Sequence, residues 1–119
     1  MLKRLFGRKP SINPLGFYQG RHYTEQIDRV RALKRAEKLD EAERLLLALL
    51  DVVEAENAVK QFGVAPWYFE QLAIIYRSRK DYAAEVAILE RCHQQPYSRG
   101  APAFAGRLEK AQALLKKPI

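Results

Sequence analysis

Apolar residues recur every three or four positions along most of the chain, which is the spacing of amphipathic helices. The clearest example lies on either side of residue 80, where two such stretches flank a short polar turn. Pro66 stands at the start of the first stretch and Asp81 at the start of the second. Proline at the first helical position and an acid at the cap are both favoured at helix N-termini. Residues 66–91 therefore predict two short antiparallel helices.

A second pair of helices is predicted upstream of residue 63. The first covers about residues 23–37, and the second begins at Asp40, because Asp40 and Glu43 have the form of a capping box. The second helix runs to Phe62. Gly63 follows at a position where the left-handed backbone of a helix stop is easily adopted. At the usual rise per residue this helix is about 35 Å long.

The remaining segments complete an all-α prediction. A fifth helix starts near Pro102 and reaches Lys117. Residues 1–21 are expected to form a basic tail, because their prolines and glycines recur too often for a long helix. At 119 residues the chain is expected to form one domain. We therefore predict that residues 22–117 form two αα-hairpins followed by a capping helix, about five helices in all.

The two predicted hairpin turns resemble each other, which indicates an internal repeat. Leu39-Asp40-Glu41-Ala42 and Lys80-Asp81-Tyr82-Ala83 each place a large apolar residue and an acid close to the start of a helix. Aligning Leu39 with Tyr82 gives a period of 43 residues, longer than the roughly 34 residues of a tetratricopeptide unit. The excess lies in the second half of the long helix, at residues 54–62.

The chain resembles the tetratricopeptide repeat superfamily over roughly residues 23–95. Apolar or small residues of the second hairpin that fit the family's pattern are Phe69, Leu72, Ala73, Tyr76, Tyr82 and Leu89. Glu85 departs from the pattern, because the family places a small residue there. Arg29 departs as well, at an expected apolar position, unless the first turn is one residue longer. The string GVAPWYFEQLAIIYR is also similar to segments of small bacterial proteins. The resemblance implies stacked hairpins whose first helices line an inner, partner-binding surface.

The net charge of +7 is unevenly distributed. The first 23 residues carry five bases and no acid, residues 24–62 carry seven bases and nine acids, and residues 63–119 carry nine bases and five acids. The longest apolar run, Leu45–Leu50, is far shorter than a membrane span. The N-terminal sequence lacks the apolar run of a signal peptide. We therefore expect a cytoplasmic protein.

Residue types that carry chemistry are scarce. The single cysteine, Cys92, excludes an internal disulfide. Cys92 and His93 point about 100° apart on a helix, a poor arrangement for a nucleophile and its base, and Cys92 is expected to be a small core residue. The two histidines and one cysteine do not have metal-site spacing. We therefore expect neither catalysis nor a metal or other cofactor.

The expected function is the binding of another protein or peptide by the inner helices. Candidate residues are Trp67, Glu70 and Arg77 of the third predicted helix, with Arg31 and Arg35 of the first. Trp67 would be an apolar anchor, since tryptophan is frequent at binding hot spots. The arginines would engage carboxylates, and Glu70 would add polar selectivity. The alternative role for Trp67 is packing between the hairpins.

Two other kinds of partner stay open. The tail bases Lys3, Arg4, Arg8 and Lys9 could contact an anionic surface. Together with the basic C-terminal half, they would suit a small nucleic-acid-associated accessory protein. Self-association is the other alternative, because two repeats are few for a stacked array.

Overall fold

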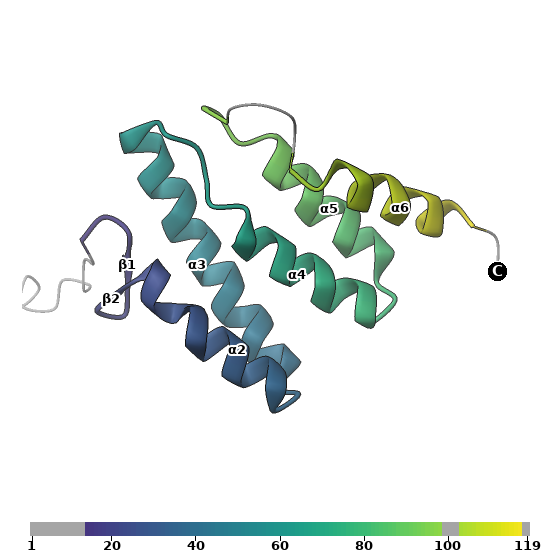
Figure 1. The fold of residues 1–119 in the computed structure, drawn as a ribbon, viewed down its shortest axis with the longest axis horizontal. Coiled ribbons are helices and arrows are strands. Elements are labelled where there is room, and N and C mark those ends of the chain that lie inside the picture. The colour runs from purple at the N-terminus through teal and green to yellow at the C-terminus, as the bar shows by residue number, and fades with distance from the viewer. Residues whose placement is uncertain (1–13, 99–102, 118–119) are drawn as a thin grey trace, which may run out of the picture.

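The computed structural model describes residues 14–98 and 103–117 (Figure 1). Within these residues the fold is all-α apart from one very small sheet. The elements are β1 (Phe17–Tyr18), β2 (Arg21–His22), a single 3₁₀ turn (Tyr23–Gln26), α2 (Ile27–Arg35), α3 (Leu39–Lys60), α4 (Trp67–Ser78), α5 (Tyr82–His93) and α6 (Ala105–Lys116). The prediction of two helical hairpins followed by one further helix is confirmed.

The helices stack in chain order. Each packs against the helices before and after it, so α3 joins the two hairpins and α5 carries α6. Figure 1 views the molecule from the side on which α2, α4 and α6 lie nearest the viewer, with α3 and α5 behind them. In the described part of the chain, no helix is long and apolar enough to cross a membrane.

One apolar core runs through both hairpins. Its fully buried side chains come from every helix of the hairpins, and include Val30, Leu46, Leu49, Leu50, Phe69, Leu72 and Leu89. Each large aliphatic or aromatic side chain removed from water contributes roughly 1.5–3 kcal/mol. The α6 helix adds less, since Ala111 is its single fully buried residue among those described.

The two hairpin turns have the same backbone conformation. Glu37 in the first turn and Lys80 in the second both adopt left-handed φ angles of 58°. In each turn the N–H of the next residue bonds to the carbonyl oxygen five residues back, the pattern of a Schellman motif. The following helices begin at Leu39 and Tyr82, the two residues that the repeat alignment pairs. The first turn is therefore no longer than the second.

The predicted capping box at the start of α3 is wrong. The N-cap residue is Lys38, and no side chain accepts a hydrogen bond from this helix end. Asp40 and Glu43 instead receive hydrogen bonds from Arg79, at 2.5 and 2.7 Å. Asp40 is the second residue of α3, so it lies inside the helix and not at its N-cap, and both carboxylates bind a guanidinium of the other hairpin.

The predicted cap of α5 is confirmed, because the Ala84 N–H donates to Asp81 Oδ1 at 3.1 Å. The end of α3 differs from the prediction. The left-handed stop residue is Gln61 (φ 59°), two residues before Gly63. Gly63 (φ 92°) donates its N–H to Asn57 Oδ1 at 2.7 Å, which turns the chain toward α4. The α6 helix begins at Ala105, later than predicted.

The small β-hairpin was missed by the sequence pattern, and the predicted boundary at residue 21 falls inside it. The two strands pair with Phe17 opposite His22, and their connecting residues Gln19 and Gly20 have φ angles of 52° and 82°. Two successive positive φ angles are typical of the type I′ turn that joins short strands. The strand β1 packs on α3. The tail bases Lys3, Arg4, Arg8 and Lys9 lie outside the described residues.

A buried carboxylate holds this hairpin in place. The Tyr23 hydroxyl donates to Glu56 Oε1 at 2.8 Å, and His22 Nε2 lies 3.5 Å from Glu56 Oε2. Gly16 passes so close that a Cβ there would lie 2.6 Å from Glu56 Oε2, and its φ of 84° is also left-handed. Only glycine meets both conditions at this position.

Candidate partner-binding surface

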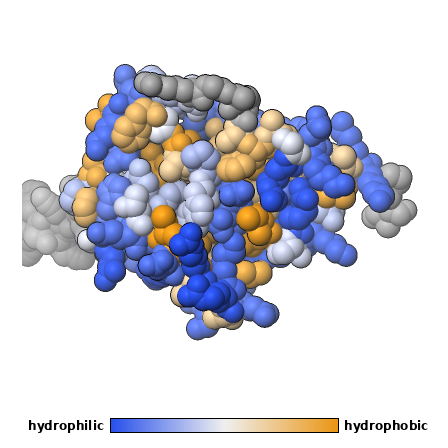
Figure 2. Space-filling model, in the orientation of Figure 1, coloured by the Kyte–Doolittle hydropathy of each residue, from blue (hydrophilic) through white to orange (hydrophobic). Residues whose placement is uncertain are grey.

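Six side chains form a continuous surface over the first helices of the two hairpins. They share one spacing on both helices, at positions i, i+3 and i+4, which places them on one side of each helix. The set, called the α2–α4 face below, is Arg31, Lys34 and Arg35 of α2 with Trp67, Glu70 and Gln71 of α4. Figure 2 shows this side of the molecule, where hydrophilic side chains surround small, separate apolar areas.

Trp67 is the first residue of α4 and joins this face to α2. The guanidinium of Arg31 stands 5.8 Å from the centroid of the indole ring, a cation–π contact between the hairpins. The edge of the ring packs against Tyr68, with ring centroids 5.0 Å apart at 82°. Tyr68 is itself fixed, since it is 2% exposed and its hydroxyl donates to the Tyr23 carbonyl oxygen at 2.9 Å. The indole is therefore held on one side and partly exposed on the other.

Lys34 of α2 and Glu70 of α4 place opposite charges close enough to interact across the face. Lys34 donates a hydrogen bond to the side-chain oxygen of Gln71. Partial burial lowers the pKa of Lys34, while the negative charge of Glu70 acts in the opposite direction. Arg35 follows Arg31 by one turn of α2 and is exposed, with no ion pair inside the described part of the chain. The face thus offers three cations, one acid and one aromatic ring.

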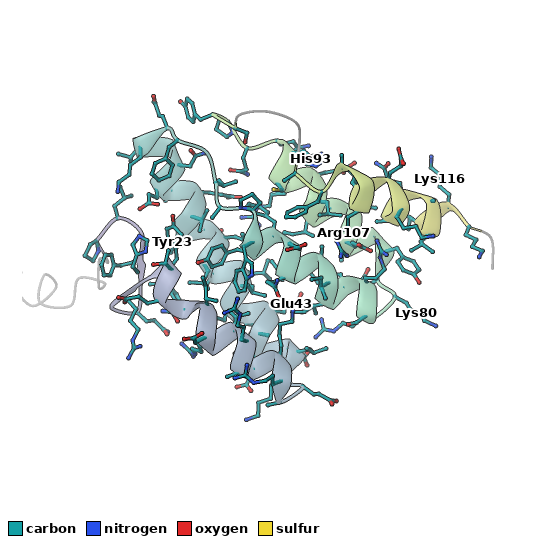
Figure 3. The ribbon with its side chains drawn as sticks, in the orientation of Figure 1. Tyr23, Glu43, Lys80, His93, Arg107 and Lys116 are labelled. Carbon is teal, nitrogen blue, oxygen red and sulfur yellow. The ribbon has the colours of Figure 1, made fainter. Side chains whose placement is uncertain are left out.

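The structure gives Arg77 a different position from the one expected. Its Nε donates to Glu85 Oε1 at 2.6 Å, and its Nη2 donates to the carbonyl oxygen of Arg107 at 3.5 Å. Arg107 extends from α6 toward the second hairpin (Figure 3), and its Nη1 lies 3.5 Å from Glu85 Oε2. Glu85 is fully buried, and its Oε2 has no hydrogen-bond partner among the described residues. Arg77 therefore joins α4, α5 and α6, with its side chain 29% exposed and its guanidinium bound to the buried Glu85.

Two more arginines of the C-terminal half are held by acids of α3. Arg79 binds Asp40 and Glu43, and its hydrogen bond lowers the pKa of the Glu43 carboxyl. Arg91 binds Glu54 at 2.7 Å and Asp51 at 3.2 Å. These contacts neutralise much of the positive charge that the sequence places after residue 63.

Cys92 is a core residue, as expected. It is 5% exposed, and burial raises the pKa of its thiol to about 11, so the reactive thiolate is scarce at neutral pH. The His93 ring does not face it, since His93 Nε2 lies 2.6 Å from the Ala103 carbonyl oxygen. Among residues 14–98 and 103–117, no group of three or more metal-ligating side chains comes together.

Comparison with known proteins identifies no relative. No protein-family model, curated protein or solved structure matches the chain. The tetratricopeptide resemblance therefore stays a prediction made from the residues.

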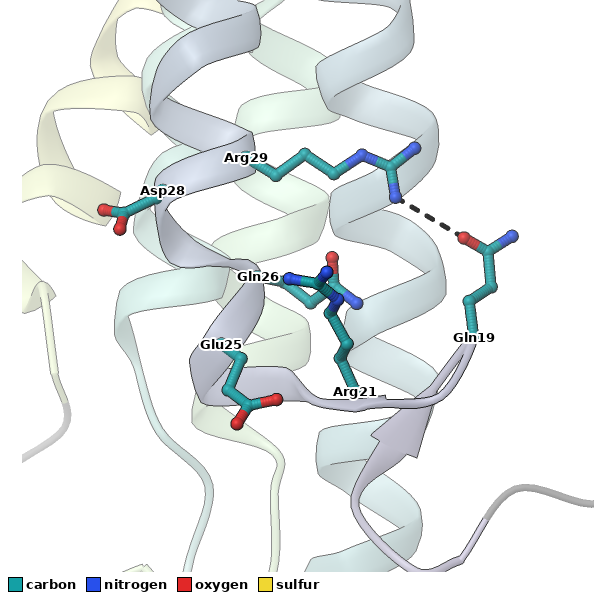
Figure 4. A pocket seen from close by; sticks show the side chains of 6 residues that line it. All are labelled: Gln19, Arg21, Glu25, Gln26, Asp28 and Arg29. Atoms are coloured by element: carbon teal, nitrogen blue, oxygen red, sulfur yellow. Dashed lines mark hydrogen bonds between the residues drawn. The ribbon is translucent and has the colours of Figure 1, made fainter.

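Sequence reasoning missed one polar hollow. It lies where the β-hairpin turn meets the start of α2, and its cations are Arg21 and Arg29 (Figure 4). The segment around Arg21 was assigned to a tail, so nothing brought these two residues together. The available signal was the Gln19-Gly20 pair, a two-residue turn between aromatic and polar neighbours.

Proposed function

We propose that this chain is a non-catalytic protein- or peptide-binding module, and that the α2–α4 face is its binding surface. The proposal rests on one observation, the partly exposed Trp67 ring beside the guanidinium of Arg31. Tryptophan and arginine are the residues most enriched at binding hot spots. Here one lies on each hairpin, so the surface exists only when the two hairpins are stacked.

Each side chain of the face has a role in this proposal. The exposed side of Trp67 would receive an apolar side chain of the partner, and Arg31 and Arg35 would bind its carboxylates. Glu70 would select against partners with an acid beside the anchor, because like charges repel at this distance. Arg77 has no place in the set, since Glu85 already occupies its guanidinium. The module would act as a scaffold in the cytoplasm, a setting that a free, buried cysteine supports.

Nucleic-acid binding is less well supported. Four arginines after residue 63 have carboxylate partners within the chain: Arg77, Arg79, Arg91 and Arg107. A guanidinium that is hydrogen-bonded to a buried or half-buried acid is a weak phosphate ligand. The basic C-terminal half therefore offers fewer contacts to a phosphate backbone than its composition indicates.

Peptide display tests the proposal directly. The immobilised protein selects binders from a random peptide library, and the affinities of selected peptides are then compared between variants. We expect Trp67→Ala to weaken binding about 30-fold or more, since a hot-spot residue contributes at least about 2 kcal/mol. Phe62→Ala is the matched control, because Phe62 is an aromatic residue 53% exposed at the far end of α3.

Helical content is checked by circular dichroism for both variants. Equal affinities for the Trp67 variant and the wild type would refute the assignment of the α2–α4 face. An equal loss in both variants would show that the peptides bind aromatic surface without regard to this face.

A further inference from the structure

The polar hollow beside the β-hairpin has the size of a small-molecule site. Its volume is about 410 Å³, within the usual range of roughly 300–1,000 Å³ for ligand pockets. One wall is the turn between β1 and β2, and the other is the 3₁₀ turn with the first residues of α2 (Figure 4). Its lining residues are Gln19, Arg21, Glu25, Gln26, Asp28 and Arg29.

The two guanidiniums enter the hollow from different elements. Arg21 is on β2 and Arg29 on α2, and Figure 4 shows both directed into the space between the helix and the hairpin turn. The Arg29 Nη1 makes one long hydrogen bond, 3.4 Å, to Gln19 Oε1. Arg21 has no ion pair or side-chain hydrogen bond within the described part of the chain. Most of the donor groups of both arginines are therefore available to a ligand.

Gln26 fixes the floor of the hollow. It is 3% exposed, and its Nε2 donates to the Tyr18 carbonyl oxygen at 3.1 Å, which ties the 3₁₀ turn to β1. The two acids do not neutralise the arginines. The Asp28 side chain is 98% exposed and lies 3.8 Å from Arg31, and Glu25 is an exposed residue at the rim of the hollow. Neither acid pairs with Arg21 or Arg29.

We propose that this hollow binds a small phosphomonoester. A phosphate group presents three oxygens in a tetrahedral arrangement and carries close to two negative charges. Donors on two sides of the hollow suit that geometry, whereas a planar carboxylate is satisfied by a single guanidinium fork. The volume leaves room for a small organic group. Hydroxyl or amino groups on it would meet the rim acids Glu25 and Asp28.

The proposal stands apart from the α2–α4 face, with which it shares no residue. Glycerol 3-phosphate is the probe, titrated into ¹⁵N-labelled full-length protein at millimolar concentrations, with amide shifts followed by NMR. We expect saturable shifts at residues 19–21 and 26–29. Sulfate should compete because it is also tetrahedral, whereas acetate and glycerol should not produce the same saturable shifts.

Substitution identifies the ligands. The double variant Arg21→Ala, Arg29→Ala should bind glycerol 3-phosphate at least about tenfold more weakly, since it removes two charge-assisted contacts. Both positions are exposed, so the variant is expected to keep its stability within about 0.5 kcal/mol. Arg35→Ala is the matched control, an exposed arginine on the same helix outside the hollow, and Trp67→Ala should also bind the probe normally.

Several outcomes would overturn the proposal. The proposal fails if glycerol 3-phosphate produces no saturable shifts, or if the double variant binds it as well as the wild type does. It also fails if Arg35→Ala weakens binding as much as the double variant, or if acetate binds as well as glycerol 3-phosphate. Binding to vesicles that contain phosphatidic acid, without binding to soluble glycerol 3-phosphate, would assign the arginines to a lipid surface instead. Loss of peptide binding in Trp67→Ala with intact probe binding would separate this site from the proposed peptide surface.

Discussion

Ala42 and Glu85 occupy equivalent places in the two hairpins but could hardly differ more in chemistry. Each is the fourth residue of its helix, and each is fully buried. In the first hairpin the position holds a methyl group. In the second it holds a carboxylate that contacts Arg77 on one side and Arg107 on the other. The same backbone position thus accepts a charge only where two other helices supply guanidiniums.

Glu85 also stands where the sequence resemblance predicts a small residue. A small residue at this place lets neighbouring helices approach through apolar contact. Glu85 replaces that contact with an ion triad that spans α4, α5 and α6. Buried triads of this kind contribute little net stability, but removing one member is costly, because it leaves a charge buried and unpaired. The second hairpin is therefore specific for α6, whereas the first relies on general apolar packing.

The largest effect is expected from placing a carboxylate in the first hairpin. Ala42→Glu would overpack a fully buried site and bury a charge for which no guanidinium is prepared. We expect the free energy of unfolding, measured by urea denaturation, to fall by about 4 kcal/mol or more. Ala83→Glu at an exposed position is the control, with a change within about 0.5 kcal/mol. If Ala42→Glu lowers the free energy of unfolding by less than about 1 kcal/mol, the first hairpin can also accept a buried carboxylate, which would contradict the difference described between the two hairpins.

A somewhat smaller effect is expected from breaking the triad. Arg77→Ala leaves Glu85 buried without its hydrogen-bonded partner, which should cost about 3–5 kcal/mol. In a Glu85→Ala background, which gives the second hairpin the alanine of the first, the same substitution should cost less than about 1 kcal/mol. A double-mutant cycle in urea measures the difference. Additive losses would mean that Arg77 acts through packing of its stem alone.

Local sequence predicted the backbone well and the use of side chains less well. The helices, the Asp81 cap and the pairing of Leu39 with Tyr82 follow from spacing and capping preferences, which depend on near neighbours. Asp40 has a stronger local capping pattern than Asp81, yet α3 begins one residue before it and Arg79 binds it from 39 residues away. The strands at residues 17–22 contain two residues each, too few to show an alternating pattern.

In the candidate surface, too, one contact could be predicted from the fold and another could not. Stacked hairpins bring their first helices together, so the contact between Arg31 and Trp67 follows from a correct fold prediction. The contact between Arg77 and Glu85 does not follow from the fold prediction. It depends on which side chains pack around residue 85. An arginine eight residues from a glutamate, across a tight turn, is a signal only once the turn geometry is known.

The smallest effect concerns the two acids near the helix starts. Asp81→Ala removes a cap and should cost about 1 kcal/mol, with little dependence on salt. Asp40→Ala removes an exposed ion pair with Arg79, and should cost at most about 1 kcal/mol in low salt and less at high ionic strength. Thermal denaturation at two salt concentrations compares them. Equal salt dependence of the two losses would show that both acids work in the same way.

The hydrogen bonds at the end of α3 involve residues that are far apart along the chain. Asn57 is 1% exposed, and its side-chain amide needs two partners, the Gly63 N–H and the Pro96 carbonyl oxygen. During synthesis, a chain that has reached residue 63 has the first partner but must grow by a further 33 residues to gain the second. Burial of this amide without an acceptor is unfavourable. The last turns of α3 therefore have their full set of hydrogen bonds only when the segment that follows α5 is packed against them, which ties the end of the first hairpin to the end of the second.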